Sequence, residues 1–157
     1  MPRLLAVRCR PAAEGAVTNA LRQLGTVRPL GPHRLVLVEL PDARRQAAVV
    51  KRLRGWREDG RVEFFTPVLR DAETGLLRIL TDEITVRFKP HVPVTRRAEI
   101  QRKLGVRTLR RNEFVPDQRV VRVARPVGLK TLTVARALDR SPDVEYAAPN
   151  YISQYRR

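Results

Sequence analysis

The sequence predicts an α+β fold of two tandem β-α-β-β-α-β units, each with an antiparallel sheet. Strand-like alternation and helix-like spacing of apolar residues follow one another in that order. Several short motifs of the first half also recur in the second half, which indicates an internal duplication. The chain has 157 residues, 43% of them hydrophobic, which is enough for a core in one domain or in two small ones.

The recurring motifs mark corresponding elements of the two halves. Each half contains a strand ending in proline, a helical stretch ending in Leu-Gly, a second strand ending in proline, and a closing strand that begins Val-Glu. One such match is weak evidence, whereas four matches in the same order make a duplication the best explanation. The paired segments are 7–11 with 86–90, 23–25 with 103–105, 34–41 with 119–126, and 61–67 with 143–149.

In the first half, apolar spacing predicts four strands and two helices. Gly25 follows the first helix, where a left-handed glycine often ends a helix. Asp42 is a suitable cap for the second helix, whose inward residues are expected to be Ala47, Val50 and Leu53. The expected strands are 4–10, 26–30, 34–40 and 61–66, and the expected helices are 12–24 and 42–57.

The second half repeats this order. Ile84, Val86 and Phe88 alternate along its first strand and should face the helices, and Thr95 is the expected cap of its first helix. The expected strands are 83–89, 106–110, 119–124 and 144–148, and the expected helices are 95–104 and 129–138.

This element order is the ferredoxin-like arrangement, with two helices on one face of each sheet and the other face open. The expected domains are a first repeat at 1–70, a linker at 71–80, and a second repeat with a C-terminal tail at 81–157. Residues 76–80 of the linker are apolar enough to add a short strand.

The net charge of +16 admits a nucleic acid, another anionic surface or an acidic protein as partner. The positive charge is almost all arginine and is spread along the chain, which the coding bias of a GC-rich genome also explains. RNA-recognition sheets stack bases on aromatic residues. The central strands here contain one aromatic residue, Phe88, and its alternation with Ile84 and Val86 indicates that it points to the core. A basic ferredoxin-like module that binds nucleic-acid phosphates is therefore the alternative function, and a plain interaction module is a third.

Residues that carry catalysis do not cluster in this sequence. There are two histidines, each beside a proline, and a single cysteine, Cys9, with no base near it in the sequence. No glycine-rich phosphate-binding motif is present. We therefore expect a non-enzyme with no catalytic residue, no metal site and no cofactor.

The N-terminal residues lack the hydrophobic region of a signal peptide, and no apolar run is long enough to span a membrane. We therefore expect no membrane association and a cytoplasmic location for the chain as given. A fragment of a secreted precursor would instead be extracellular.

The second half contains a more specific pattern. A strand ITVRFKP lies at 84–90, a helix ends in KLG at 103–105, and VEYAAPNY closes the domain at 144–151. In this order and spacing, these motifs resemble the N-terminal prodomain of subtilisin-like serine proteases, in the fervidolysin-like branch. The resemblance covers about half of the chain, and the first half matches it more loosely.

This resemblance implies an intramolecular chaperone, an inhibitor, or both, for a subtilisin-like serine protease, acting in cis from a longer precursor or in trans. In that family the open sheet face packs on two protease helices, and the C-terminal tail lies in the substrate cleft. An acidic residue usually precedes the Pro-Asn pair; Ala148 stands there in this chain, and Glu145 is a candidate substitute. The implied protease-facing sheet residues are Thr85, Arg87, Val120, Arg122, Glu145 and Ala147, and the implied tail residues are Asn150, Tyr151, Ile152, Ser153, Gln154, Tyr155, Arg156 and Arg157.

Overall fold

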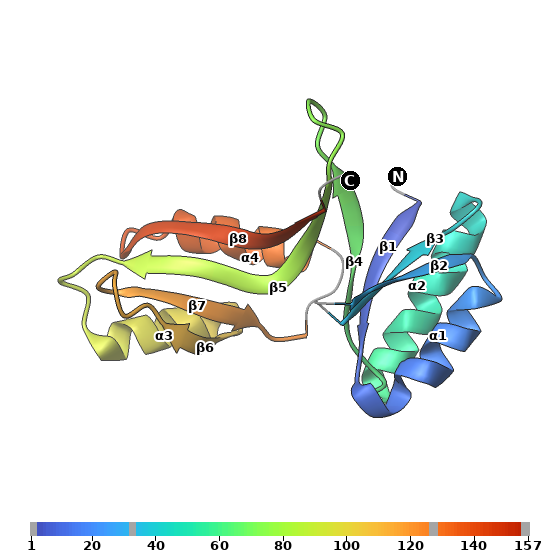
Figure 1. The fold of residues 1–157 in the computed structure, drawn as a ribbon. Coiled ribbons are helices and arrows are strands. Elements are labelled where there is room, and N and C mark those ends of the chain that lie inside the picture. The colour runs from blue at the N-terminus through green and yellow to red at the C-terminus, as the bar shows by residue number, and fades with distance from the viewer. Residues whose placement is uncertain (1–2, 32–33, 126–128, 155–157) are drawn as a thin grey trace. The chain divides into compact units, whose positions relative to one another are not determined.

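The structure is a computed structural model that describes residues 3–31, 34–125 and 129–154 (Figure 1). Within these ranges the chain forms four α-helices, one short 3-10 helix and eight strands. The α+β class expected from the sequence is confirmed. The chain divides into two compact units: the first runs to Ile79 and includes the C-terminal end from Ser153, and the second spans Leu80–Ile152.

The first unit begins with a complete β-α-β-β-α-β sequence of elements. Antiparallel pairing places its strands in the order β2-β3-β1-β4, which is the ferredoxin-like order. Both helices cover the same face of this sheet (Figure 1). The elements are β1 (Leu4–Cys9), the 3-10 helix η1 (Pro11–Ala13), α1 (Glu14–Arg22), β2 (Thr26–Leu30), β3 (Leu35–Glu39), α2 (Ala43–Glu58) and β4 (Val62–Arg70).

The central strands β1 and β3 of the first unit's sheet have buried side chains on both faces. Val7 lies opposite Val36 and Phe65, and all three are buried. On the other face, Ala6 lies opposite Leu37, and both are also buried. The sequence is consistent with this burial, because consecutive residues of β1 and β3 are apolar, as in strands that are buried on both faces.

Three local expectations for the first unit have different outcomes. Asp42 caps α2 as expected, because its side chain accepts a hydrogen bond from the Arg45 N–H at 2.7 Å. Gly25 is not left-handed; a Cβ there would clash with the Glu39 carbonyl oxygen, so this glycine permits a close backbone approach. The inward face of α2 also differs from expectation. Val49 is buried where Val50 was expected, and Ala47, which was expected to face inward, is exposed.

The segment expected to be a linker, 71–80, forms a turn and then the beginning of the next strand. β5 (Leu77–Phe88) starts within it, in agreement with the short strand expected at 76–80. The Asp71 N–H donates to the Leu76 carbonyl at 2.9 Å, and Val68 lies opposite Ile79 in the resulting β4–β5 pairing. Gly75 has φ +67, the left-handed conformation that this turn requires.

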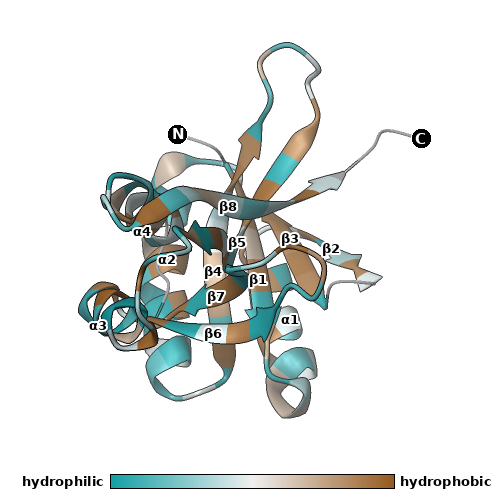
Figure 2. Ribbon diagram, turned by 90° about the vertical axis from the view of Figure 1, so that its left-hand side faces the viewer, coloured by the Kyte–Doolittle hydropathy of each residue, from teal (hydrophilic) through white to brown (hydrophobic). Residues whose placement is uncertain are grey.

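The second unit repeats the arrangement of the first. Its strand order is β6-β7-β5-β8, with β8 pairing only with β5 in the described chain. Brown and teal alternate along α3 and α4 in Figure 2, as expected for helices with one apolar face. After β5 the elements are α3 (Val94–Leu104), β6 (Val106–Arg111), β7 (Gln118–Val123), α4 (Lys130–Asp139) and β8 (Val144–Gln154).

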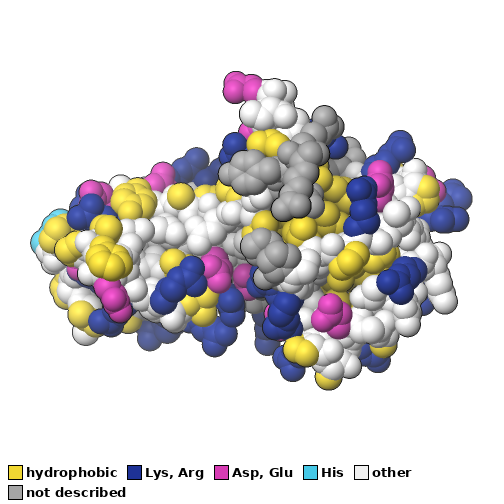
Figure 3. Space-filling model, in the orientation of Figure 1, with side chains coloured by type: hydrophobic (Ala, Val, Ile, Leu, Met, Phe, Trp, Pro, Cys, Tyr) yellow, Lys and Arg dark blue, Asp and Glu magenta, His cyan; other side chains and the backbone are white. Residues whose placement is uncertain are grey.

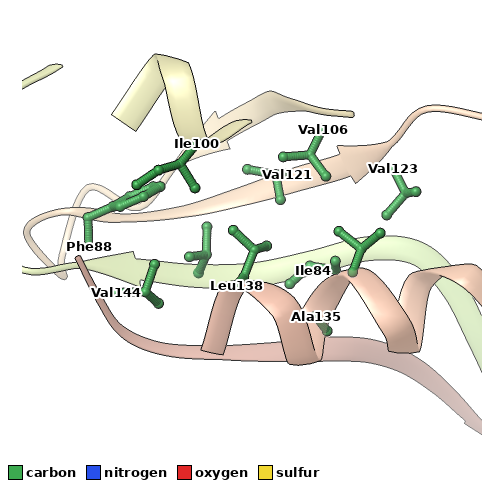
Figure 4. Packing of buried hydrophobic residues seen from close by; sticks show 11 residues of the cluster. Ile84, Phe88, Ile100, Val106, Val121, Val123, Ala135, Leu138 and Val144 are labelled. Carbon is green, nitrogen blue, oxygen red and sulfur yellow. The ribbon is translucent and has the colours of Figure 1, made fainter. Parts of the chain in front are cut away.

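The core of the second unit lies between its sheet and its two helices (Figure 4). Side chains from β5, β7, α3 and α4 meet there, and Ile84, Val86 and Phe88 point into it as expected. The helix boundaries differ slightly from expectation: α3 begins at Val94 after Pro93 and has no side-chain cap, so Thr95 is not the cap. No helix in the described ranges is long and apolar enough to cross a membrane.

Candidate functional site

The face of the second sheet that points away from the core carries the residues of the expected binding surface. Thr85 lies opposite Val120, and Arg87 lies opposite Gln118. Successive residues of a strand point to opposite faces, so burial of Ile84, Val86 and Phe88 in the core turns their neighbours outward. Thr85, Arg87, Val120 and Arg122 are all half-buried, which makes a flat surface of mixed polarity.

The two arginines of this face are already paired with carboxylates. Arg87 Nε lies 3.3 Å from a carboxylate oxygen of Glu145 on β8. Arg122 contacts Asp82 at 3.1 Å and Glu83 at 3.3 Å, both on β5. The sequence analysis did not identify Asp82 and Glu83 as partners of Arg122. The strand register could have identified Glu83, which lies directly opposite Arg122.

Two residues of β8 were assigned to this face from the sequence, and only one of them lies on it. Glu145 is on the outward face, where it pairs with Arg87. Ala147 packs against the core cluster, so its placement on the outward sheet surface is wrong. Val144 is also in the core, and two inward residues three positions apart mean that regular alternation is interrupted in β8. The Ala147 N–H donates to the Asp139 carboxylate at 3.0 Å, which ties this irregular stretch to the end of α4.

The C-terminal residues that were expected to form a free tail are largely part of β8. The strand runs to Gln154, so its expected end at Ala148 is wrong. Thr81 Oγ1 donates to the Asn150 carbonyl at 3.0 Å, and Thr85 Oγ1 donates to the Asn150 side-chain oxygen at 2.9 Å. Asn150 therefore fastens β8 to β5. Of the remaining tail residues, Tyr151, Ile152, Ser153 and Gln154 lie in β8, whereas Tyr155, Arg156 and Arg157 lie outside the described residues.

Cys9 and the His, Asp and Glu side chains are the residues to consider for chemistry. Burial, followed by the charges of Glu14 and Glu63, raises the pKa of Cys9 to about 11, so its thiol is protonated at neutral pH. Across residues 3–31, 34–125 and 129–154, no three His, Cys, Asp or Glu side chains converge as metal ligands do. The arrangement offers a surface for binding.

The fold and this surface define a ferredoxin-like α+β domain with a partly exposed sheet face and an edge strand at the C-terminus. A family model for the fervidolysin N-terminal prodomain matches residues 72–150, half of the chain. The chain belongs to the fervidolysin N-terminal prodomain-like family, which confirms the resemblance inferred from its motifs. In general terms, its role is that of a protease propeptide. A comparison with curated proteins gave no match.

Proposed function

We propose that the second unit binds a subtilisin-like serine protease and acts as its intramolecular chaperone, its inhibitor, or both. The observation that carries this proposal is the family match, which extends from the turn before β5 to Asn150 and so contains β5, β6 and β7 and the first seven residues of β8. The protease would contact the surface formed by Thr85, Arg87, Val120, Arg122 and Glu145.

The charge pairing of this surface supports a role in protein binding. Burying an unpaired charge in an interface is costly, whereas a charge that keeps its partner on burial costs far less. Arg87 and Arg122 each bring a carboxylate partner with them. A protease helix pair could therefore cover Val120 and Thr85 without leaving an uncompensated arginine.

The chaperone role follows from mass action. A domain that binds the folded protease, and not the unfolded chain, stabilises the folded form by RT ln(1 + [L]/Kd). In a single precursor the local concentration of a tethered domain is on the order of millimolar, so even a modest intrinsic affinity gives substantial stabilisation. No catalytic group in the prodomain is required for this effect.

For inhibition, we propose that the residues beyond Asn150 occupy the substrate cleft in the manner of a cleaved product. β8 is an edge strand, and the outer edge of such a strand has backbone N–H and C=O groups free to pair with another chain. Side chains of this segment, with Tyr151 and Ile152 as candidates on its two opposite faces, would then fill pockets of the protease. The Asn150 contacts would hold the start of this segment in place.

The test is an inhibition constant measured against a broad-specificity subtilase. Removing Ile152–Arg157 should raise this constant more than tenfold, which corresponds to a loss above ~1.4 kcal/mol. Removing only Tyr155–Arg157 leaves all of β8 and reports the contribution of the last three residues. Circular dichroism of each truncated form checks the fold. Equal constants for full-length and truncated chains would refute the cleft mechanism.

The sheet contact has its own test. Arg87→Glu reverses a charge on the outward face and should weaken inhibition at least tenfold. Arg102→Glu makes the same change in net charge at an exposed position of α3, on the helix side of the sheet, and should leave inhibition unchanged. Inhibition that falls equally in both variants would show that net charge, and not this face, determines binding. No inhibition by the full-length chain would overturn the inhibitory role.

A further inference from the structure

Helix α2 of the first unit carries a concentration of positive charge that the proposed function does not use. Of its 16 residues, six are arginine or lysine and only Glu58 is acidic. Figure 3 shows cationic side chains scattered over the face that it draws, with acidic ones among them. The family match begins at residue 72, so α2 lies outside it.

The cations of α2 point away from the core. Val49 and Leu53 are at most 1% exposed and define the inner face of the helix. With 3.6 residues per turn, Arg44 and Lys51 lie on the opposite face, and Arg52 and Arg54 lie on either side of them. All four side chains belong to exposed residues.

These four cations form no ion pair or hydrogen bond with any residue that the structure describes. Arg52 has one other contact: its guanidinium lies 5.6 Å from the centre of the Trp56 ring, an interaction that does not occupy its N–H groups. Arg45 provides the contrast, because its guanidinium lies 4.0 Å from the Asp42 carboxylate. The charge of the outer face is therefore available to an external anion.

The space between the cations indicates which kind of partner fits. Ala47, Ala48 and Gly55 lie there, and a Cβ built on Gly55 would meet nothing within 4 Å. Protein interfaces rely on large aromatic or aliphatic anchors, and membrane-surface helices insert an apolar face. The outer face of α2 offers neither: Val49 and Leu53 face the core, and Val50 and Trp56 are half-buried to either side of them. Binding of nucleic-acid phosphates, by contrast, requires positive charge and no apolar anchor.

We propose that the outer face of α2, formed by Arg44, Lys51, Arg52 and Arg54, binds the phosphate backbone of nucleic acid independently of base sequence. From Arg44 to Arg54 the helix rises ~15 Å. Over that length each strand of a duplex presents about four phosphates. The match in length and charge allows each cation one phosphate. This function is separate from protease binding, which involves the second unit.

The test is the affinity of the full chain for a labelled mixed-sequence duplex, measured by fluorescence anisotropy over a range of salt concentrations. The quadruple variant R44Q/K51Q/R52Q/R54Q should bind at least tenfold more weakly at about 0.15 M salt. Its slope of log K against log[salt] should be smaller by about 3.6, because four phosphate contacts at ~0.9 each are lost. Glutamine is a good helix former, so α2 should remain folded. The single variants R44Q and K51Q should each reduce the slope by about 0.9.

The matched control removes four exposed cations from the second unit: R102Q/K103Q/R107Q/R111Q. It has the same net charge as the α2 variant and should retain most of the affinity. Equal losses in the two quadruple variants would show binding by overall charge and would overturn the assignment to α2. Failure of the unmodified chain to bind the duplex at about 0.15 M salt would overturn nucleic-acid binding itself, without affecting the protease proposal.

Discussion

Arg97 and Arg119 both place their guanidinium groups over the ring of Phe88, 5.6 and 5.2 Å from its centre. Both residues are buried, at 7% and 8% exposure. Arg97 donates hydrogen bonds to two backbone carbonyls and to the Asp117 carboxylate. The Nε atom of Arg119 is buried and has no hydrogen-bond partner among the described residues, and burial followed by the charge of Arg97 lowers the pKa of this guanidinium. The two arginines should therefore contribute differently to stability.

We expect Arg97→Met to lower the free energy of unfolding by about 3 kcal/mol, because it removes a buried, hydrogen-bonded charge and leaves its partners unsatisfied. Arg119→Met should be neutral or stabilising, because methionine fills the space without the cost of burying an unpaired charge. Urea unfolding of both variants measures this difference. A large loss of stability in Arg119→Met would mean that its contact with Phe88 matters more than its desolvation.

Because of Cys9, the free energy of unfolding should depend on pH in the alkaline range. Its pKa is about 11 in the folded protein against 9.0 for an unperturbed thiol, so the unfolded chain loses the proton first as pH rises. The contribution of Cys9 is fully present below about pH 9 and falls by about 1.4 kcal/mol per pH unit between the two pKa values. From pH 8.5 to pH 10, the unmodified chain should lose about 1 kcal/mol more than Cys9→Ala does. Parallel pH dependences of the two proteins would contradict the raised pKa.

At the scale of single elements, β8 shows how an edge strand tolerates a proline. Pro149 lacks an N–H and would break the ladder of a central strand, but an edge strand has one side with no neighbour. β8 continues past this proline to Gln154 and is fastened at Asn150. Because Asn150 is joined to Thr85 on the outward face, the geometry of the terminal segment and of that face are linked.

Asn150→Ala should destabilise the second unit by about 1 kcal/mol, the usual net value of one hydrogen bond. Thr85→Val removes the other partner, and the double variant should lose less than the sum of the two single losses, because the same bond is removed in both. Chemical denaturation of the four proteins gives the coupling energy. Strict additivity would show that the bond between Thr85 and Asn150 contributes nothing.

At the scale of the whole molecule, each unit has its own pair of α-helices and its own buried side chains. Leu53 of the first unit and Leu138 of the second are both 0% exposed. Such separate cores are expected to form separate cooperative units in hydrogen exchange.

Leu53→Ala and Leu138→Ala should each cost about 2–5 kcal/mol. In hydrogen exchange followed by mass spectrometry, each should lower protection mainly in peptides of its own unit. The two variants serve as controls for each other. Protection lost to the same extent throughout the chain in both variants would mean that the protein unfolds as one unit.

Local residue patterns were enough to predict the order of elements in both halves and the inward face of β5. Ile84, Val86 and Phe88 alternate strictly, and one apolar face in water permits only one orientation of such a strand. The same patterns, with the closing VEYAAPNY motif, identified the family. Motifs and periodicity depend on neighbouring residues along the chain, and the sequence states these directly.

Tertiary structure decided the features that depend on partners distant in sequence. The carboxylates paired with Arg122, the inward position of Ala147 and the attachment of Asn150 to β5 all arise from strand pairing. The length of β8 also depends on strand pairing, because β8 pairs with β5 and continues beyond Pro149 to Gln154. Alternation along a strand specifies which face a side chain occupies, but the residue opposite it is determined only when two distant segments pair.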